Sequence, residues 1–544
     1  MKHSITWDEQ QKARRRLEKE TGARTKDWGG KLPFAFVYPN SYFIGMSNLG
    51  LQAVYGYLNQ RPDCLCERVF WEKENSLNRT TPLSVESQRP LTDFAVLAFS
   101  LNYEIDFFNL APILESSNIP LYSEERDETM PLIIAGGPCV TANPLPVSPF
   151  FDCLCIGEAE AILPHILSRL ADGLGGKREG LLQELAQIEG VWVPRYPQPR
   201  QVVRQYVKNL NEHPVHSIVL TRETELGDLF LVETGRGCAH ACRFCLVSSA
   251  FSPMRFHQLD SILRQAEDGL KLRARIGLVG PAVTDHPQIE ELLDQLLNQK
   301  AQISISSLRI SSLNGSLLKK MVKGGLRSVA LAPEAGSPCL RGVIKKGLSE
   351  EQILAAVRLA AEAGMQQIKL YFMVGLPQET DSDIQSIVDL TLKGKALIEK
   401  AGSQARLTLN ISPFIPKAGT VFQWLPMAGL KDIQSRISLI KNQLTSRGVK
   451  INSESPLWSE VQSVLSRGDN RLAAVLADMR KEALPDWRDA IAKHRLDLDY
   501  FAHQRWDTAQ KLPWHFIDSG VPVTKIKAEL NQALGDSQAC DDGK

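Results

Sequence analysis

Residues 229–245 read LFLVETGRGCAHACRFC, and this stretch decides how the rest of the chain is interpreted. Its first part, Leu229 to Glu233, is an apolar run with the composition of a buried strand. Two glycines, Gly235 and Gly237, follow, and then three cysteines in the spacing C-x3-C-x2-C. We therefore expect the cysteines to lie on one tight loop at the carboxyl end of a strand, where parallel barrels place their active sites.

The three cysteines, Cys238, Cys242 and Cys245, have a spacing that favours an iron–sulfur cluster. Three thiolates on one loop can each bind one iron of a cubane [4Fe–4S] cluster, which leaves the fourth iron without a protein ligand. The chain has only 10 cysteines, too few for a disulfide scaffold. A zinc ion is the alternative, and it would take His240, inside the same loop, as its fourth ligand.

The composition excludes several classes of protein. Hydrophobic residues make up 43% and charged residues 23% of the chain, as in an ordinary globular protein. The formal net charge is +1, so no overall field attracts nucleic acid or a membrane. No apolar run approaches the roughly 18 residues of a membrane span, and the first residues lack the apolar core of a secretion signal. We expect a cytoplasmic protein.

The 544 residues predict several α/β domains. Apolar runs such as Val96 to Leu101 and Leu132 to Gly137 alternate with helical patterns, which indicates a doubly wound parallel sheet. A second alternation after the cysteines supplies six strand–helix units, short of a full barrel. The expected order is a helical segment (1–30), the doubly wound sheet (31–200), a linker (201–225), a partial (β/α)6 barrel (226–450), a small helical region (451–534) and a disordered tail (535–544).

From the cysteine loop to about Leu425 the chain resembles the radical S-adenosylmethionine (SAM) superfamily. This resemblance implies an enzyme that cleaves SAM reductively at a [4Fe–4S] cluster and acts on its substrate through the resulting 5′-deoxyadenosyl radical. It also implies an electron donor such as a flavodoxin or a ferredoxin. The substrate cannot be named from the sequence, and nothing in it indicates a nucleic-acid or membrane partner.

The same resemblance suggests which residues contact SAM. The aromatic residue before the third cysteine would lie by the adenine, and a small-residue turn after the second strand would receive the methionine amino group. An arginine after the third strand would pair with the methionine carboxylate, although a surface arginine is an equal reading. A glutamate at the fourth strand would bind a ribose hydroxyl or the amino group, and the fifth-strand segment would line the adenine pocket. In this order the residues are Phe244, Gly280, Arg309, Glu334, and Val374, Gly375 and Leu376.

The first 200 residues resemble the cobalamin-binding type of domain that often precedes such a barrel. Gly136-Gly137-Pro138 and Gly157-Glu158-Ala159-Glu160 occupy strand ends, where open sheets bind ligands. The D-x-H-x-x-G motif is missing, and no histidine occurs between His3 and His165. Cobalamin binding therefore stays open. With cobalamin, methyl transfer or a related rearrangement would be the expected reaction.

A methylthiotransferase and a non-enzymatic iron–sulfur protein are the two alternatives to the radical SAM function described above. Methylthiolation of tRNA or of a ribosomal protein would need an N-terminal cluster domain and a small RNA-binding barrel, and the sequence indicates neither. A non-enzymatic iron–sulfur redox or regulatory protein would not need the SAM-pocket segments. The C-terminal stretches Arg467-Gly468-Asp469 and Leu512 to Val521 resemble those of bacterial radical SAM proteins of unassigned reaction. One cysteine, Cys540, remains near the end of the chain.

Several further residues have two readings each. The paired cysteines of the first domain and Cys139 are expected to pack in the core rather than to bind a metal. Glu379 is expected to cap a helix. Four side chains at strand ends are either ligand contacts or helix caps, and His286 is either a proton carrier for the substrate or an ordinary loop histidine. The cysteines are Cys64, Cys66, Cys153 and Cys155, and the strand-end residues are Tyr42, Asn48, Tyr103 and Glu104.

Overall fold

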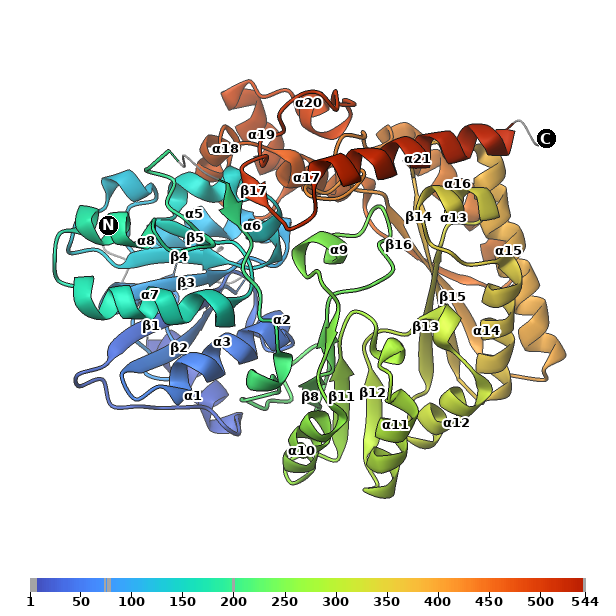
Figure 1. Cartoon of the computed structure of the whole chain (residues 1–544), viewed down its shortest axis with the longest axis horizontal. Helices are drawn as coiled ribbons and strands as arrows, with labels where there is room; N and C mark the ends of the chain where they lie inside the picture. Colours follow the sequence, from blue (N-terminus) through green and yellow to red (C-terminus); the bar gives the residue numbers. More distant parts are fainter. Residues whose placement is uncertain (1–6, 73–74, 76–79, 198–200, 542–544) are drawn as a thin grey trace.

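The computed structural model describes residues 7–72, 75, 80–197 and 201–541, and the side chains only as far as residue 535. A sheet domain formed by the first 200 residues lies beside an open curved array of strands, and C-terminal helices run across both (Figure 1). In the part of the chain that the structure describes, no helix is both long enough and apolar enough to cross a membrane.

The N-terminal domain is a six-stranded sheet in the order β2-β1-β3-β4-β5-β6. All neighbours are parallel except β5 and β6. The chain order reverses between β1 and β3, which is the point where doubly wound sheets open a ligand site. The strands are β1 (Leu32–Tyr38), β2 (Cys64–Phe70), β3 (Val96–Ser100), β4 (Leu132–Gly136), β5 (Cys153–Cys155) and β6 (Val191–Trp192).

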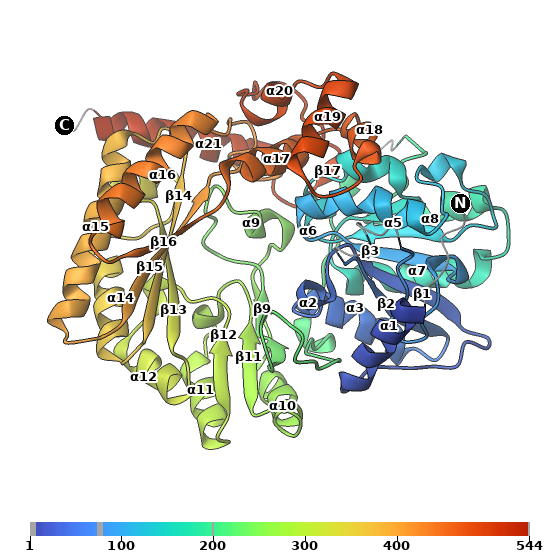
Figure 2. The ribbon, with the colours of Figure 1, turned by 180° about the vertical axis from the view of Figure 1, so that it is seen from behind.

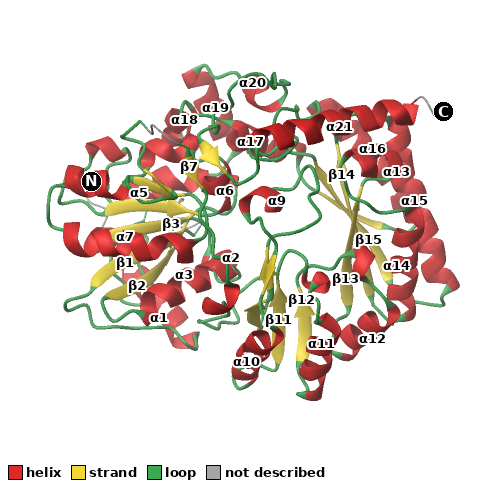
Figure 3. Cartoon of the chain, viewed as in Figure 1, coloured by secondary structure: helices red, strands yellow, loops and turns green. Residues whose placement is uncertain are grey.

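Helices cover both faces of this sheet, so its strands are buried nearly throughout (Figures 1 and 3). Cys64, Cys66, Cys153 and Cys155 belong to the apolar core on one face, and Cys139 belongs to the core on the other. Their expected role as core residues agrees with this burial. The main helices are α1 (Trp7–Lys19), α3 (Leu49–Gln60), α5 (Leu110–Ser116), α6 (Pro138–Ala142), α7 (Ala159–Gly173) and α8 (Arg178–Leu185).

The central domain has the expected open α/β arrangement, with seven parallel strands in two sheets where six strand–helix units were predicted. The sheets have the orders β12-β11-β8 and β13-β14-β15-β16, and no ladder joins β12 to β13 within the described residues. The N–H of Ile303 donates to the carbonyl of Gly324, which precedes β13, at 2.7 Å. The strands are β8 (Phe230–Glu233), β11 (Arg275–Val279), β12 (Gln302–Ile305), β13 (Ser328–Glu334), β14 (Gln367–Val374), β15 (Arg406–Pro413) and β16 (Lys450–Ser453).

Amphipathic helices pack on the outer side of these strands (Figure 2). Each follows a strand and returns the chain for the next parallel one, as a right-handed strand–helix–strand unit requires. The carboxyl ends of the strands are thereby left free for loops. The helices are α10 (Leu259–Leu270), α11 (Ile289–Asn298), α12 (Gly315–Lys323), α14 (Glu350–Glu362), α15 (Asp381–Lys400) and α16 (Leu430–Thr445).

The C-terminal region shares one core with both domains. Phe108 of the N-terminal domain, Trp424 of the central domain and Trp514 belong to the same buried apolar cluster. The short strand β17 (Ile517–Asp518) pairs with β7 (Val202–Val203), which lies in the segment expected to be a linker. The region contains α17 (Pro456–Arg467), α18 (Leu472–Asp478), α19 (Leu484–His494), α20 (Leu498–Ala502) and α21 (Val523–Asp541).

Helix α21 runs to Asp541, into the segment predicted to be a disordered tail. Ile526, Leu530 and Ala533 bury the apolar side of its earlier turns. The side chain of Cys540 lies outside the described residues.

Candidate active site

The cysteine loop leaves β8, passes through the two-residue strand β9 (Gly235–Arg236) and enters the short helix α9 (Val247–Ala250). Gly237 has φ +80°, and a Cβ there would lie 2.5 Å from the carbonyl oxygen of Phe251, so only glycine fits. Ala241 takes φ +49°, a conformation that non-glycine residues rarely adopt. Such local strain is common where side chains are held for a function.

The three thiols share one environment. Cys242 is buried, and Cys238 and Cys245 are half-buried. Burial raises the pKa of Cys242, and the nearby charges of Lys346 and Arg309 act against this rise. The other two cysteines also influence the pKa of Cys245, which burial likewise raises. The loop has therefore brought the three thiols close to one another and to two cationic side chains.

Within the described residues, no three His, Cys, Asp or Glu side chains are arranged as the ligands of one metal ion would be. His240, the alternative fourth ligand of zinc, instead places Nε2 2.7 Å from a carboxylate oxygen of Asp285. The spacing fits a cubane better, because each thiolate there binds a different iron.

Arg243, between the second and third cysteines, clamps the loop to the rest of the molecule. Its buried guanidinium donates to the carbonyl of Val343 at 3.0 Å and to the Glu529 carboxylate at 3.2 Å. Its backbone N–H donates to Ile344 at 3.1 Å. Glu529 lies in α21, so the C-terminal helix directly supports the cysteine loop.

Arg309 and Glu334 both lie near Cys242, as their influence on its pKa shows. Arg309 follows β12, and its Nε is 3.4 Å from Asp285 but is buried without a hydrogen bond among the described residues. Glu334 ends β13 at a break in the strand register and has φ +69°. Its carboxylate accepts a bond of 3.2 Å from Lys346.

Val374, Gly375 and Leu376 form the tight turn after β14. Gly375 has φ +80°, and its N–H donates to Glu379 at 2.6 Å. Arg436 binds the same carboxylate oxygen at 2.7 Å, and burial raises the pKa of Glu379 to about 7. The expected role of Glu379 as a helix cap is wrong, because Thr380 caps α15 and Glu379 holds the turn.

Gly280 and Phe244 have different neighbours in the structure. The N–H of Gly280 donates to Ser306 at 3.3 Å, and Gly280 lines the large cavity described next. Phe244 packs against the apolar cluster that contains Leu376. Arg309 and Glu334 thus lie near Cys242, whereas Phe244 packs against the apolar cluster.

A cavity of about 460 Å³ separates the N-terminal sheet from the cysteine loop. Small-molecule sites usually enclose about 300–1,000 Å³. The carboxyl ends of β1, β3, β4 and β5 form one wall, and Gly235, Gly237, Val279 and Gly280 form the other. The lining is mostly apolar, and none of the described residues that line it is a histidine.

The glycines at the strand ends have a structural reason apart from any ligand. A Cβ at Gly137 would lie 2.5 Å from the carbonyl oxygen of Leu101, and one at Gly157 would lie 2.0 Å from that of Gln205. Both glycines also line the cavity. The close backbone contacts alone are enough to require glycine at both positions.

A network of buried charges joins the two domains at the rim of this cavity. Arg236 donates to Glu158 at 2.9 Å, to Glu160 at 2.6 Å and to Glu233 at 2.8 Å. Arg255 donates to Glu158 at 2.6 Å. Glu158 and Glu160, considered ligand contacts from their sequence, are therefore held by arginines of the central domain. Sequence reasoning missed Arg236, although its place between two glycines just before Cys238 was a signal.

The other sequence candidates have structural partners. His286 is buried, with its Nε2 2.9 Å from the His257 carbonyl and its Nδ1 accepting from Gln288. It has no ring nitrogen left for substrate chemistry.

The four strand-end residues of the first domain also have structural partners or surroundings. Glu104 binds Lys417 at 2.6 Å and Gln462 at 2.8 Å, so it joins the N-terminal domain to the central domain and to the C-terminal region. Tyr42 donates to Glu20 at 2.5 Å, and Tyr103 is half exposed. Asn48 caps α3 and also lines the large cavity.

Comparison with known proteins gives matches along most of the chain. Residues 232–391 match the family model described as the radical SAM superfamily, and residues 50–194 match that of radical SAM proteins, N-terminal. An uncharacterized protein of Methanocaldococcus jannaschii is 31% identical over 450 residues, which cover 81% of this chain and 90% of that protein. An uncharacterized methyltransferase of Pyrococcus horikoshii is 26% identical over 48% of this chain and 58% of its own length.

Two more matches are weaker. A putative methylthiotransferase of Methanocaldococcus jannaschii is 25% identical over 43% of this chain and 51% of its own length. Among solved structures, the cobalamin-dependent radical SAM enzyme OxsB, with aqua-cobalamin and SAM bound, has a TM-score of 0.49 at 13% identity. That match covers 94% of this chain and 80% of OxsB.

Proposed function

Because this chain belongs to the radical SAM superfamily, and is thus an enzyme that uses a [4Fe–4S] cluster and SAM, we propose that Cys238, Cys242 and Cys245 hold that cluster. The observation that carries the proposal is the grouping of three thiols on one loop, which Arg243 holds in place. The cationic Arg309 and the anionic Glu334 lie near Cys242. These residues fit the cluster, since they offer three thiolates and leave one iron free.

When bound, the cluster supplies the electron that cleaves SAM to methionine and a 5′-deoxyadenosyl radical. The residues of the chain bind and orient SAM for this step. Arg309 would fork onto the methionine carboxylate, which gives its unsatisfied buried Nε a partner. Glu334 would accept from the amino group or from a ribose hydroxyl. Lys346 and Asp285, their present partners, keep both side chains in place until SAM arrives.

The remaining contacts would position the adenosine part of SAM. The turn at Val374, Gly375 and Leu376 would lie against the adenine, because Gly375 lets the backbone approach closely. Phe244 would contact the base from the loop side, and Gly280 would lie by the methionine end. Glu379 and Arg436 act through Gly375, since they hold its N–H and so fix the turn.

We further propose that the large cavity takes a corrinoid and that the reaction is a cobalamin-dependent methyl transfer. The cavity has a mostly apolar lining and lies at the sheet's switch point, where doubly wound sheets bind ligands. None of the described residues that line it is a histidine, so a corrinoid would be held there by apolar side chains and by the backbone at the strand ends. The match to an uncharacterized methyltransferase gives additional support.

Methylthiolation is the alternative reaction. The match to a putative methylthiotransferase, which is 25% identical, supports it. Known chemistry of that kind uses a second cluster, held by an N-terminal cluster domain that the sequence does not indicate. The two reactions differ in product, so mass analysis of the modified substrate distinguishes them. The reducing electron would come from a flavodoxin or a ferredoxin.

The cluster proposal is tested by the iron content of anaerobically reconstituted protein. We expect about four irons per chain for the wild type and almost none after replacement of Cys238, Cys242 and Cys245 by alanine. Wild-type iron content in the triple variant would show that the cluster is held elsewhere. The single variant Cys64→Ala, in a core cysteine of the first sheet, is the matched control and should keep its iron.

A further inference from the structure

A second cavity, of about 210 Å³, lies behind α9, the helix that follows the cysteine loop. Leu246 and Ser249 form its wall on the loop side, and α21 closes it opposite with Ile526 and Lys527. Thr141 and Ala250 line both this cavity and the larger one, so the two are neighbours. None of the residues proposed to contact SAM lines the smaller cavity.

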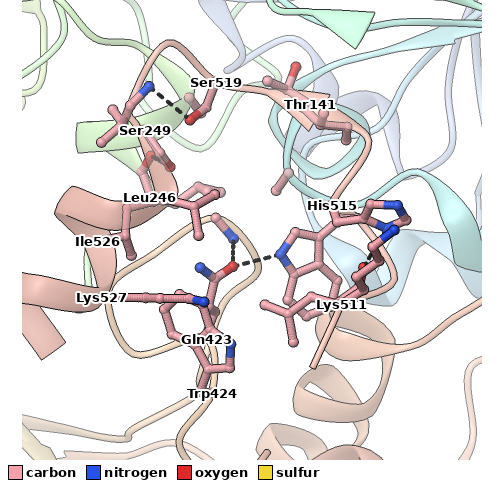
Figure 4. Close-up of a pocket in the computed structure, with 18 of the residues that line it drawn as sticks. Thr141, Leu246, Ser249, Gln423, Trp424, Lys511, His515, Ser519, Ile526 and Lys527 are labelled. Atoms are coloured by element: carbon pink, nitrogen blue, oxygen red, sulfur yellow. Dashed lines mark hydrogen bonds between the residues drawn. The ribbon is translucent and has the colours of Figure 1, made fainter. Parts of the chain in front are cut away.

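Three of the side chains that line this cavity and can donate hydrogen bonds, Gln423, Trp424 and Lys527, lie together on one side of it, and Lys511 and His515 lie on the other (Figure 4). Trp424 is only 2% exposed, and its Nε1 has no hydrogen-bond partner among the described residues. A buried indole N–H normally finds an acceptor, so this one points to a missing ligand.

The amide of Gln423 is oriented by its neighbours. Its oxygen accepts from the indole of Trp514 at 2.6 Å and from the N–H of Gly419 at 3.0 Å. The carbonyl end is therefore occupied, and the amide NH₂ remains as a donor without a partner in the described part of the chain. The ammonium of Lys527 extends across the cavity toward Gln423 (Figure 4), and no described carboxylate pairs with it.

The same cavity is poor in acceptors. None of the described residues that line it is acidic. The hydroxyl of Ser519 accepts from Val521, and that of Thr141 accepts from Gly157. The other polar residues of the lining are Ser249, Gln510, Lys511 and His515, and its apolar surface comes mainly from Trp514, Leu246 and Ile526.

We propose that this cavity binds a small organic anion, with its carboxylate or phosphate on Lys527, Gln423 and Trp424 and its apolar body against Trp514 and Leu246. An anionic oxygen satisfies three donors that the protein leaves unpaired, and a charge-assisted bond to lysine favours it over a neutral acceptor. The volume limits the ligand to a molecule about the size of a substituted benzene ring. This site is separate from those of the cluster, SAM and the corrinoid.

Fluorine NMR titration of the reconstituted full-length protein tests the proposal. The probes are 4-fluorobenzoate and 4-fluorophenyl phosphate, with the neutral 4-fluorobenzamide for comparison. We expect at least one anion to bind and the neutral amide to bind about tenfold more weakly or not at all. Stronger binding of benzoate or of the phosphate identifies which anionic group the site prefers.

Variants locate the binding. Lys527→Gln removes the charge, and Trp424→Phe removes the N–H but keeps a ring, so each should weaken anion binding about tenfold. Lys525→Gln changes an exposed lysine of the same helix outside the cavity and should bind like the wild type. Equal affinity in all four proteins, no binding of either anion, or equal binding of the neutral amide would overturn the proposal. Because binding is measured directly, these results do not depend on SAM cleavage.

Discussion

Glu334 shows how a single residue is prepared for a ligand. It takes φ +69° at the end of a strand, where glycine or asparagine would be expected. The strand register breaks at the same point, and Lys346 holds the carboxylate at 3.2 Å. An unfavourable backbone conformation that the surroundings enforce is frequent at ligand sites. Its position near Cys242 makes this carboxylate a candidate partner for SAM.

Replacement Glu334→Gln should therefore weaken SAM binding by at least about tenfold, because a hydrogen bond to a charged group contributes about 1.5–3 kcal/mol. Equilibrium dialysis of SAM against reconstituted protein measures the effect. Glu362→Gln, in an exposed ion pair of α14, serves as control and should bind SAM normally. If Glu334→Gln and the control have the same affinity, Glu334 does not contact SAM.

The cysteine loop could be predicted at this scale, but its charged neighbours could not. The spacing of Cys238, Cys242 and Cys245 is local and chemically specific. Arg236, in contrast, binds Glu158, which is 78 positions away, and no local pattern encodes that pairing. For the same reason, the sequence predicts a helix cap at Glu379, whose partners Gly375 and Arg436 meet only in the folded chain.

At the scale of elements, helix α21 acts as a brace for the loop. Its Glu529 binds both Arg243, between two cysteines, and Lys345 beyond α13 (Pro338–Val343). Arg243 is buried, so loss of the carboxylate would leave a charge with fewer partners in a site of low polarity. The helix thus stabilises the geometry of the loop without contributing a ligand.

The variant Glu529→Gln should release iron to a chelator about tenfold faster than the wild type, as do changes in residues that support metal ligands. Iron release is followed by absorbance of the iron–chelator complex under anaerobic conditions. Lys525→Gln on the same helix should match the wild type. An unchanged release rate in Glu529→Gln would mean that α21 does not stabilise the loop.

The division of the central strands into two sheets was not visible in the sequence. Each strand reads as a separate apolar run, and the pattern does not state which neighbour it pairs with. In the described residues, β12 and β13 share no ladder, and Ile303 donates to Gly324, which precedes β13.

For the whole molecule, the central feature is a cavity between two domains. The N-terminal sheet directs its strand ends at the cysteine loop, and buried ion pairs of Arg236 and Arg255 join the two sides. Trp424 and Phe108, from different domains, share one core with the C-terminal helices. The parts are therefore held together rigidly, and a ligand in the cavity of about 460 Å³ would face the loop.

Protein incubated with hydroxocobalamin and then desalted should retain about one cobalt per chain, because a corrin ring buries a large apolar area. Its absorption spectrum should lack the signature of histidine ligation. Ala53→Trp, which fills the cavity from α3, should abolish retention, whereas Ala171→Trp on the exposed side of α7 should not. No cobalt in the wild type, or equal cobalt in Ala53→Trp, would mean that the cavity does not bind the corrinoid.

Cleavage of SAM by a cluster on Cys238, Cys242 and Cys245 is measured by the 5′-deoxyadenosine that the protein forms. Reconstituted protein is reduced with a strong reductant in the presence of SAM, and 5′-deoxyadenosine is quantified by chromatography. We expect slow formation of 5′-deoxyadenosine and methionine even without substrate, and none from the triple alanine variant. Full iron loading with no 5′-deoxyadenosine from the wild type would contradict it.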